Sequence, residues 1–148
     1  MREILFRGKR YDNGERVHGD LVHVENKSYI SYYYESPLSI FINEQIKYDD
    51  ISIVGVAPFI EVDLATIGQY TGLTDKNGTK IFEGDCFKTY CTGLPVYKHI
   101  VGYYPEHFAF MARCIEMNTV HYLSDYRPSA IEIIGNIYDN PELLEATE

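Results

Sequence analysis

The sequence predicts a mainly β protein in which N-terminal β-hairpins pack on a small SH3-like β-barrel in the C-terminal half. Three observations support this fold class. Strand-forming residues are abundant, with 14 tyrosines among 148 residues. Asn-Gly pairs, which favour tight hairpin turns, occur between alternating segments. Apolar segments recur at a spacing of about 8 to 12 residues, which is typical of small barrels and sandwiches.

In the N-terminal region, a two-residue turn at Asn13-Gly14 separates the first two expected strands, because Asn and Gly accept the positive φ that such turns require. A second tight connection follows at residues 25–27. Strands are expected over the segments 3–11, 15–24, 28–34, 39–43 and 51–59.

The C-terminal region begins with a short helical turn near residues 63–67, which Asp63 can cap by accepting from the following backbone N–H groups. The Asn140-Pro141 pair predicts a short C-terminal helix. Strands are expected over 69–73, 79–90, 96–104, 107–115, 118–123 and 130–138. We therefore divide the chain into a hairpin region, 1–60, and a barrel region, 61–148, within one compact unit.

The stretch LTDKNGTKIFEGD, residues 73–85, admits three interpretations. A calcium loop needs Gly at its sixth position, but Gly78 is at the fourth position when Asp75 is the first. A phosphate-binding P-loop needs a Gly-Lys-Ser/Thr string that opens a helix, and this stretch has none. A hairpin turn at Asn77-Gly78 fits the alternating flanks, so the sequence favours a reversal between two strands.

The same pattern occurs earlier in the chain. Both stretches place Asn-Gly, a basic residue and a β-branched residue before a Gly-Asp pair that ends at Asp20 or Asp85. The second copy is one residue longer, which would reverse the facing of its strand unless Gly84 forms a bulge. We interpret the pattern as the same local structure used twice, in which the Asp carboxylate accepts hydrogen bonds from the backbone N–H groups of the turn.

Three strings resemble the YopX family of phage and prophage proteins: VDLATIGQYTGLTDKNGTKIFEGD, ILFRGKRYDNGERVHGDL and EIIGNIYDNPELL. They lie at both ends and in the middle of the chain. The resemblance implies a mainly β protein with a C-terminal barrel, encoded by phages or prophages and able to form oligomers, with no defined activity. The sequence departs from the family at His18, where an aromatic ring is common, and at Leu64-Ala65, where Pro-Glu is common.

No catalytic or metal signature stands out. The sequence has no Gly-x-Ser-x-Gly elbow, and a zinc site from Cys86, Cys91, His99, Cys114 and His121 lacks close paired spacing. Glu83 and Asp85 could act as paired carboxylates, but acids two apart on a strand more often form a solvated face or tie a turn. We therefore expect no enzyme activity, no metal and no cofactor.

Tyrosines form the candidate interaction surface, because their large, rigid rings carry a polar tip that suits protein interfaces. Side chains alternate along a strand, so Tyr32 and Tyr34 face one way and Tyr33 the other. One set can enter the core, and packing between the two halves is the competing explanation. The candidates are Tyr29, Tyr32, Tyr33, Tyr34, Tyr103 and Tyr104.

The net charge of −9 disfavours unspecific nucleic-acid binding, although residues 1–16 carry five Lys or Arg against three acids. Without an apolar leader or a membrane-length apolar run, we expect a cytoplasmic protein that does not enter membranes. The leading hypothesis is a non-enzymatic phage accessory protein that binds itself or an unidentified phage or host protein. The alternatives are a nucleic-acid-binding small barrel, an acidic mimic of nucleic acid and an enzyme.

Overall fold

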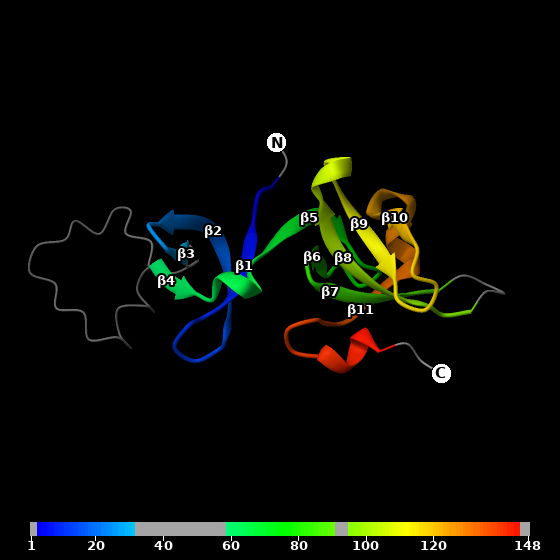
Figure 1. Ribbon diagram of the computed structural model, residues 1–148. Coiled ribbons are helices and arrows are strands. Elements are labelled where there is room, and N and C mark those ends of the chain that lie inside the picture. The colour runs from blue at the N-terminus through cyan, green and yellow to red at the C-terminus, as the bar shows by residue number, and fades with distance from the viewer. Residues whose placement is uncertain (1–2, 32–58, 91–94, 146–148) are drawn as a thin grey trace, which may run out of the picture.

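The computed structural model describes residues 3–31, 59–90 and 95–145 as two antiparallel β-sheets that lie side by side (Figure 1). The first sheet has six strands in the order β4-β3-β2-β1-β5-β6. Their bounds are β1 Phe6–Lys9, β2 Arg16–Val24, β3 Lys27–Ser31, β4 Phe59–Val62, β5 Gly68–Thr74 and β6 Lys80–Phe82.

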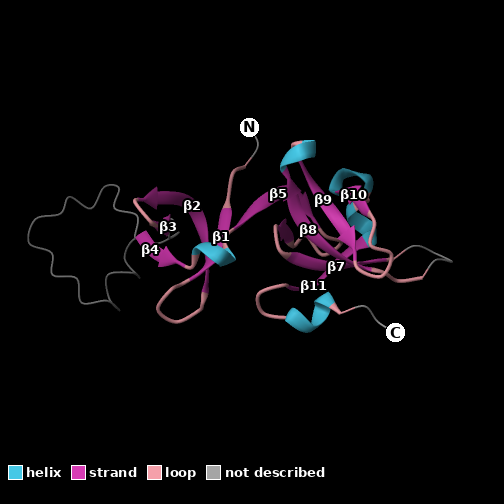
Figure 2. Ribbon diagram, in the orientation of Figure 1, coloured by secondary structure: helices cyan, strands magenta, loops and turns pink. Residues whose placement is uncertain are grey.

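The second sheet has five strands in the order β10-β9-β8-β7-β11. Their bounds are β7 Asp85–Thr89, β8 Lys98–Tyr104, β9 Ala109–Cys114, β10 Val120–Tyr122 and β11 Ile131–Asn136. Single-turn 3₁₀ helices punctuate the strands of both sheets (Figure 2). These are η1 Leu64–Thr66, η2 Pro105–His107, η3 Leu123–Asp125, η4 Pro128–Ala130 and η5 Pro141–Leu144.

The mainly β prediction is confirmed, and both Asn-Gly pairs lie in turns between paired strands. Gly14 follows β1 at φ +73°, and β1 pairs with β2. Gly78 lies between β5 and β6 at φ +81°, and these strands also pair. The helical turn near 63–67 is η1, where the Asp63 side chain accepts from the N–H of Ala65 at 3.0 Å.

The two Gly-Asp pairs do not have the same structural role, although the repeated sequence pattern predicts that they do. Gly84 lies at φ +80° in the turn between β6 and β7, not in a bulge within a strand pair. Asp85 accepts from the backbone N–H of Phe82 at 2.8 Å, so it does tie this turn. Asp20 instead lies within β2, opposite Ser31, and is exposed. The idea that both carboxylates tie turns is therefore wrong for Asp20.

The main core lies against the second sheet, where β7, β8, β9, η3 and β11, together with β6 from the edge of the first sheet, each contribute a fully buried apolar side chain. These are Ile81, Phe87, Val101, Ala112, Leu123 and Ile131. Among the described strands, β10 and β11 remain the edges of this sheet, so the closed SH3-like barrel stays a prediction. The division at residue 60 is also untested, although the six-stranded sheet takes strands from both sides of it.

The short C-terminal helix is η5, which begins at Pro141. The expected strand at 39–43 and most of the one at 51–59 lie outside the described residues, as do Tyr32, Tyr33, Tyr34 and Cys91. Within the described residues, no helix is long and apolar enough to cross a membrane.

Candidate binding cleft and hairpin tip

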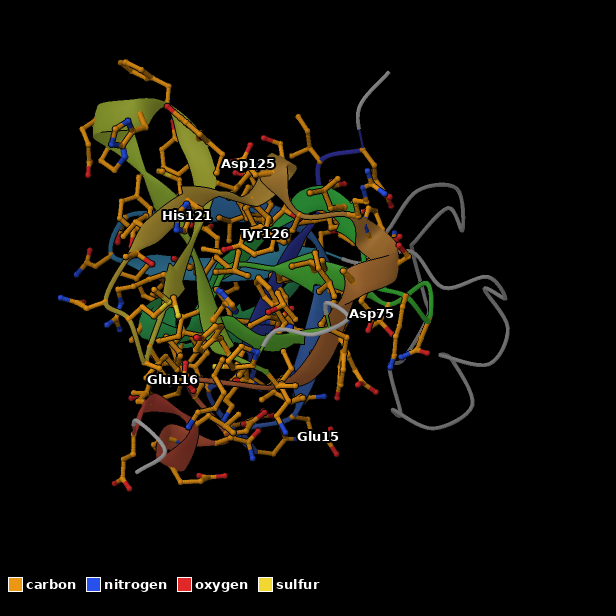
Figure 3. The ribbon with its side chains drawn as sticks, turned by 90° about the vertical axis from the view of Figure 1, so that its right-hand side faces the viewer. Glu15, Asp75, Glu116, His121, Asp125 and Tyr126 are labelled. Carbon is orange, nitrogen blue, oxygen red and sulfur yellow. The ribbon has the colours of Figure 1, made fainter. Side chains whose placement is uncertain are left out.

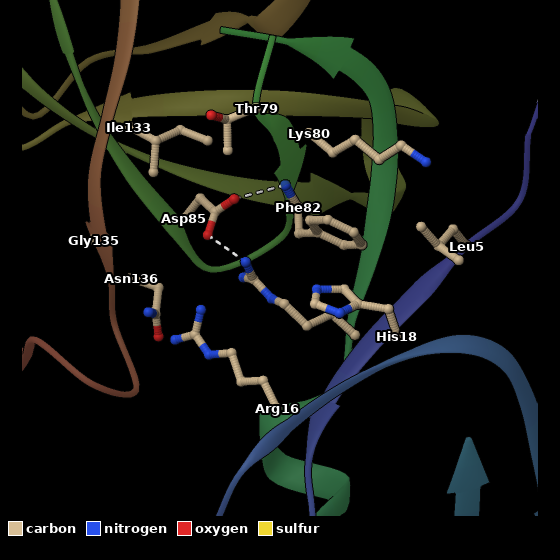
Figure 4. Close-up of a pocket in the computed structure, with 11 residues that line it drawn as sticks. Leu5, Arg16, His18, Thr79, Lys80, Phe82, Asp85, Ile133, Gly135 and Asn136 are labelled. Carbon is tan, nitrogen blue, oxygen red and sulfur yellow. Dashed lines mark hydrogen bonds and ion pairs between the residues drawn. The ribbon is translucent and has the colours of Figure 1, made fainter. Parts of the chain in front are cut away.

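A cavity of about 520 Å³ opens between the two sheets (Figure 4). One wall comes from β1 and β2, which supply Arg7, Arg16 and His18. The facing wall comes from β6, β7 and β11. Its side chains include Lys80, Phe82, Asp85, Ile133 and Asn136. This volume lies within the range of about 300–1,000 Å³ that is usual for small-molecule sites.

A buried ion pair between Arg7 and Asp85 crosses the cleft and links the two sheets. Arg7 Nη1 lies 2.7 Å from Asp85 Oδ1, and the two side chains are 8% and 2% exposed. Arg7 also donates to the carbonyl of Glu83 at 3.2 Å, and its guanidinium lies 4.7 Å from the Phe82 ring centre. Burial raises the pKa of Asp85 above its usual value, and the neighbouring Arg7 charge opposes that rise. Nothing in the sequence near Arg7 indicates that Asp85 is its partner.

Three further basic groups line the cleft. Arg16 pairs with Asp139, and Lys80 Nζ lies 2.7 Å from Glu3 Oε1. His18 lies beside Phe82, with ring centres 5.4 Å apart. Burial and the nearby Arg7 charge lower the pKa of both Arg16 and His18. The cleft therefore brings like charges together, an arrangement that the net charge of the chain does not suggest.

Asp75, the first residue of the rejected calcium loop, has a structural role that the sequence does not indicate (Figure 3). Its side chain is buried, and Oδ1 accepts from the N–H groups of Asn77 at 2.8 Å and Thr79 at 2.9 Å. Oδ2 accepts from the N–H of Ile133 in β11 at 3.2 Å. Burial alone would raise the pKa of Asp75, but these backbone donors lower it below its usual value. Asp75 thus fastens the β5–β6 turn to the second sheet and is not arranged as a calcium ligand.

The β8–β9 hairpin tip carries exposed aromatic rings. Phe108, directly after η2, is 86% exposed and has a left-handed backbone at φ +49°. Tyr103 and Tyr122 are 45% and 43% exposed. The Tyr103 ring contacts Phe110, and His107 lies against Tyr122 with ring centres 5.9 Å apart. We call Tyr103, His107, Phe108 and Tyr122 the hairpin tip.

Three of the predicted tyrosines lie within the described residues, and they are divided between the two sheets. Tyr29 lies in β3 and is half-buried, whereas Tyr103 and Tyr104 lie at the far end of β8 in the other sheet. The Tyr104 ring packs over Gly102. Phe108 is more exposed than any of these three, but its position in an apolar segment made it look like an ordinary strand residue.

The imagined zinc ligands that the structure describes do not form a metal site, although His99 lies opposite Cys114 on neighbouring strands. Cys86 and Cys114 are buried free thiols, and burial raises the pKa of Cys86 to about 11, which keeps it protonated at neutral pH. His99 stacks on Phe87 at 4.9 Å between ring centres, and burial lowers its pKa. Within the described residues, no group of three His, Cys, Asp or Glu side chains could hold a metal ion.

These features define an antiparallel two-sheet β protein with a charged cleft between the sheets. The family model described as YopX protein matches residues 5–145, so the chain belongs to the YopX family. Among solved structures, it is similar to the crystal structure of protein EF1440 from Enterococcus faecalis, at 26% identity and a TM-score of 0.50. That match covers 98% of this chain and 100% of the other. No curated protein matches.

Proposed function

We propose that this YopX-family protein is a non-enzymatic phage or prophage accessory protein of the host cytoplasm, and that it works by associating with a second copy of itself through the hairpin tip. The observation that carries the proposal is Phe108. Its ring is 86% exposed, and its backbone has φ +49°, a conformation that costs a non-glycine residue about 1–2 kcal/mol. Strain of this kind persists where surrounding structure imposes it, and it is frequent at functional sites.

The edge strand beside the tip favours a second copy as the partner. Val120, His121 and Tyr122 of β10 are all exposed, and β10 has a paired neighbour on one side only among the described strands. An edge strand offers unpaired backbone N–H and C=O groups to another strand. Two copies related by a twofold axis can pair their β10 strands and bring the same aromatic residues together, which is the self-complementary contact of a symmetric dimer.

We expect Phe108→Asn to weaken self-association at least about tenfold, because it removes the central apolar ring. Asn adopts the left-handed conformation more readily than Phe, so the free energy of unfolding should stay the same or rise. The measurement is sedimentation equilibrium over a range of concentrations, with urea unfolding as the measure of folding.

Phe59→Asn is the matched control. Phe59 is also an exposed ring on an edge strand, 61% exposed on β4, but it lies in the other sheet. This variant should associate like the wild type. A strictly monomeric wild type would contradict self-association, and capture of a phage or host protein that depends on Phe108 would move the proposal to that partner.

Nucleic-acid binding by a small SH3-like barrel is the second candidate, favoured by the gathering of Arg7, Arg16 and Lys80 around the cleft. The ion pairs weaken it, because these three residues pair with Asp85, Asp139 and Glu3. Titration with labelled single- and double-stranded DNA and RNA at low salt tests it, and we expect no binding at about tens of micromolar.

A further inference from the structure

The cleft concentrates positive charge in a chain whose net charge is −9. Three cations, Arg7, Arg16 and Lys80, line it, whereas Asp85 is the one carboxylate among the lining residues described. Both oxygens of Asp85 are engaged: Oδ1 pairs with Arg7, and Oδ2 accepts from the N–H of Phe82. Asp85 therefore pairs directly with Arg7, and it acts on Arg16 only through the attraction of its charge.

The carboxylate that does pair with Arg16 lies outside the lining. Asp139, in the turn after β11, contacts Arg16, Lys9 and the amide of Asn136. The Arg16 and Asp139 side chains are 30% and 39% exposed, and ion pairs open to water stabilise a fold only weakly. A ligand anion can therefore take the place of Asp139 at the Arg16 guanidinium. Figure 4 shows Arg16 reaching across the cleft toward Asn136.

The rest of the cleft is apolar and larger than a bare ion needs. Leu5, Phe82 and Ile133 line it, and His18 places a second ring beside Phe82. A volume of about 520 Å³ suits a small organic molecule. Phe82 is itself buried, but the exposed His18 ring that covers it offers a surface on which a flat ring can stack with an offset or edge to face.

We propose that the cleft binds a small organic oxyanion that carries a flat ring. Its phosphate or carboxylate is bound by Arg16, and its ring packs against the apolar wall near Phe82. Arg is suited to this role, because its planar fork donates two parallel hydrogen bonds to a phosphate or carboxylate. The site is separate from the hairpin tip and does not depend on self-association.

Phenyl phosphate is the simplest probe with both features, and calorimetry on the full chain should give a Kd of about 1 mM or tighter. Inorganic phosphate lacks the ring and phenol lacks the anion, so each should bind at least about tenfold more weakly. Equal binding of phenol or of inorganic phosphate would overturn the proposal. AMP and benzoate then distinguish two ligand classes. Tighter binding of AMP would identify a nucleotide as the ligand, and tighter binding of benzoate would identify an aromatic acid.

Two variants of the same ion pair should act in opposite directions. Arg16→Gln should weaken phenyl phosphate binding about tenfold, whereas Asp139→Asn should tighten it severalfold because it removes the competing carboxylate. If the Arg16–Asp139 pair had a purely structural role, Asp139→Asn would not increase the affinity for phenyl phosphate. The matched control is Arg10→Gln, since Arg10 pairs with Asp12 at 2.7 Å and does not line the cleft. Unchanged affinity in both Arg16→Gln and Asp139→Asn would overturn the assignment.

Discussion

The two Asn-Gly…Gly-Asp stretches, residues 13–20 and 77–85, share a sequence pattern but do different structural work. The first lies within one sheet, with its turn exposed and Asp20 on the surface of β2. The second connects the two sheets, with Gly84 in the connecting turn and Asp85 buried. Equivalent positions of the two stretches also meet in space, because Arg16 and His18 face the cleft from one wall and Lys80 and Phe82 from the other.

An additional turn in the second stretch explains much of this difference. The second stretch turns again at Glu83-Gly84, so Asp85 begins β7 of the second sheet, whereas Asp20 stays within β2 of the first sheet. Asp85 therefore enters the interior, where a carboxylate needs a charged or hydrogen-bonding partner. Arg7 supplies that partner from the first sheet, so the longer copy connects the two halves and the shorter copy does not.

Removing each carboxylate is the strongest test of this comparison. Asp85→Ala should lower the free energy of unfolding by about 3–5 kcal/mol, because it leaves the buried Arg7 without its anion. Asp20→Ala should change it by less than about 0.5 kcal/mol, since Asp20 is exposed. Urea unfolding of both variants measures the difference. Equal losses in the free energy of unfolding of the two variants would show that the two stretches have equivalent structural roles.

The local parts of this architecture could be predicted from the sequence. Both hairpin turns are predicted by their Asn-Gly pairs, Asn13-Gly14 and Asn77-Gly78, because few other residues accept the required φ. The strands at 98–104 and 131–136 follow from dense runs of β-branched and aromatic residues. Asp63 capping is likewise a contact within a few residues.

The long-range contacts could not be predicted in the same way. Nothing near Asp85 or Arg7 in the sequence indicates that they meet, because their pairing depends on how two sheets are placed. Asp75 looks like an ordinary turn residue, and its third hydrogen bond is to β11. Phe108 sits in a segment whose pattern predicts a strand, and only the structure places it in a left-handed turn. The candidate cleft depends on the same kind of contact and was therefore missed.

The second test compares how the two turns are fastened. The exposed turn is tied by its own Asn13, which accepts from the N–H of Glu15 at 2.9 Å, whereas Asp75 accepts three backbone N–H groups from a buried position. Asp75→Asn turns one of these acceptors into a donor. We expect it to lower the free energy of unfolding by about 2–3 kcal/mol at pH 7, and Asn13→Ala by about 0.5 kcal/mol.

The pH dependence of the free energy of unfolding separates the contribution of the Asp75 charge from that of its side-chain shape. The pKa of Asp75 is lower in the folded chain than its ordinary value of 3.8, so its stabilisation is fully present above that value. It is lost as the pH falls through the folded pKa. The difference between wild type and Asp75→Asn should therefore shrink below about pH 4. A difference that stays constant down to pH 3 would mean that the ionised form contributes nothing.

The smallest expected effect concerns the glycines, because both need a positive φ but only one is crowded. Gly14 has φ +73° and open space around it. Gly84 has φ +80°, and an added Cβ would lie 2.8 Å from the Tyr138 ring. We expect Gly14→Ala to lower the free energy of unfolding by about 1 kcal/mol through backbone strain alone, and Gly84→Ala by about 2 kcal/mol.

Tyr138→Leu separates the two contributions, since it takes away the ring that the new Cβ would meet. In this background the cost of Gly84→Ala should fall to about 1 kcal/mol, the value expected for strain alone, while the cost of Gly14→Ala should not change. Urea unfolding of the two double-mutant cycles gives both numbers. If the cost of Gly84→Ala is the same with and without the ring, the turn between the sheets is no more constrained than the exposed one, and its crowding against the C-terminal segment does not help to fix how the sheets meet.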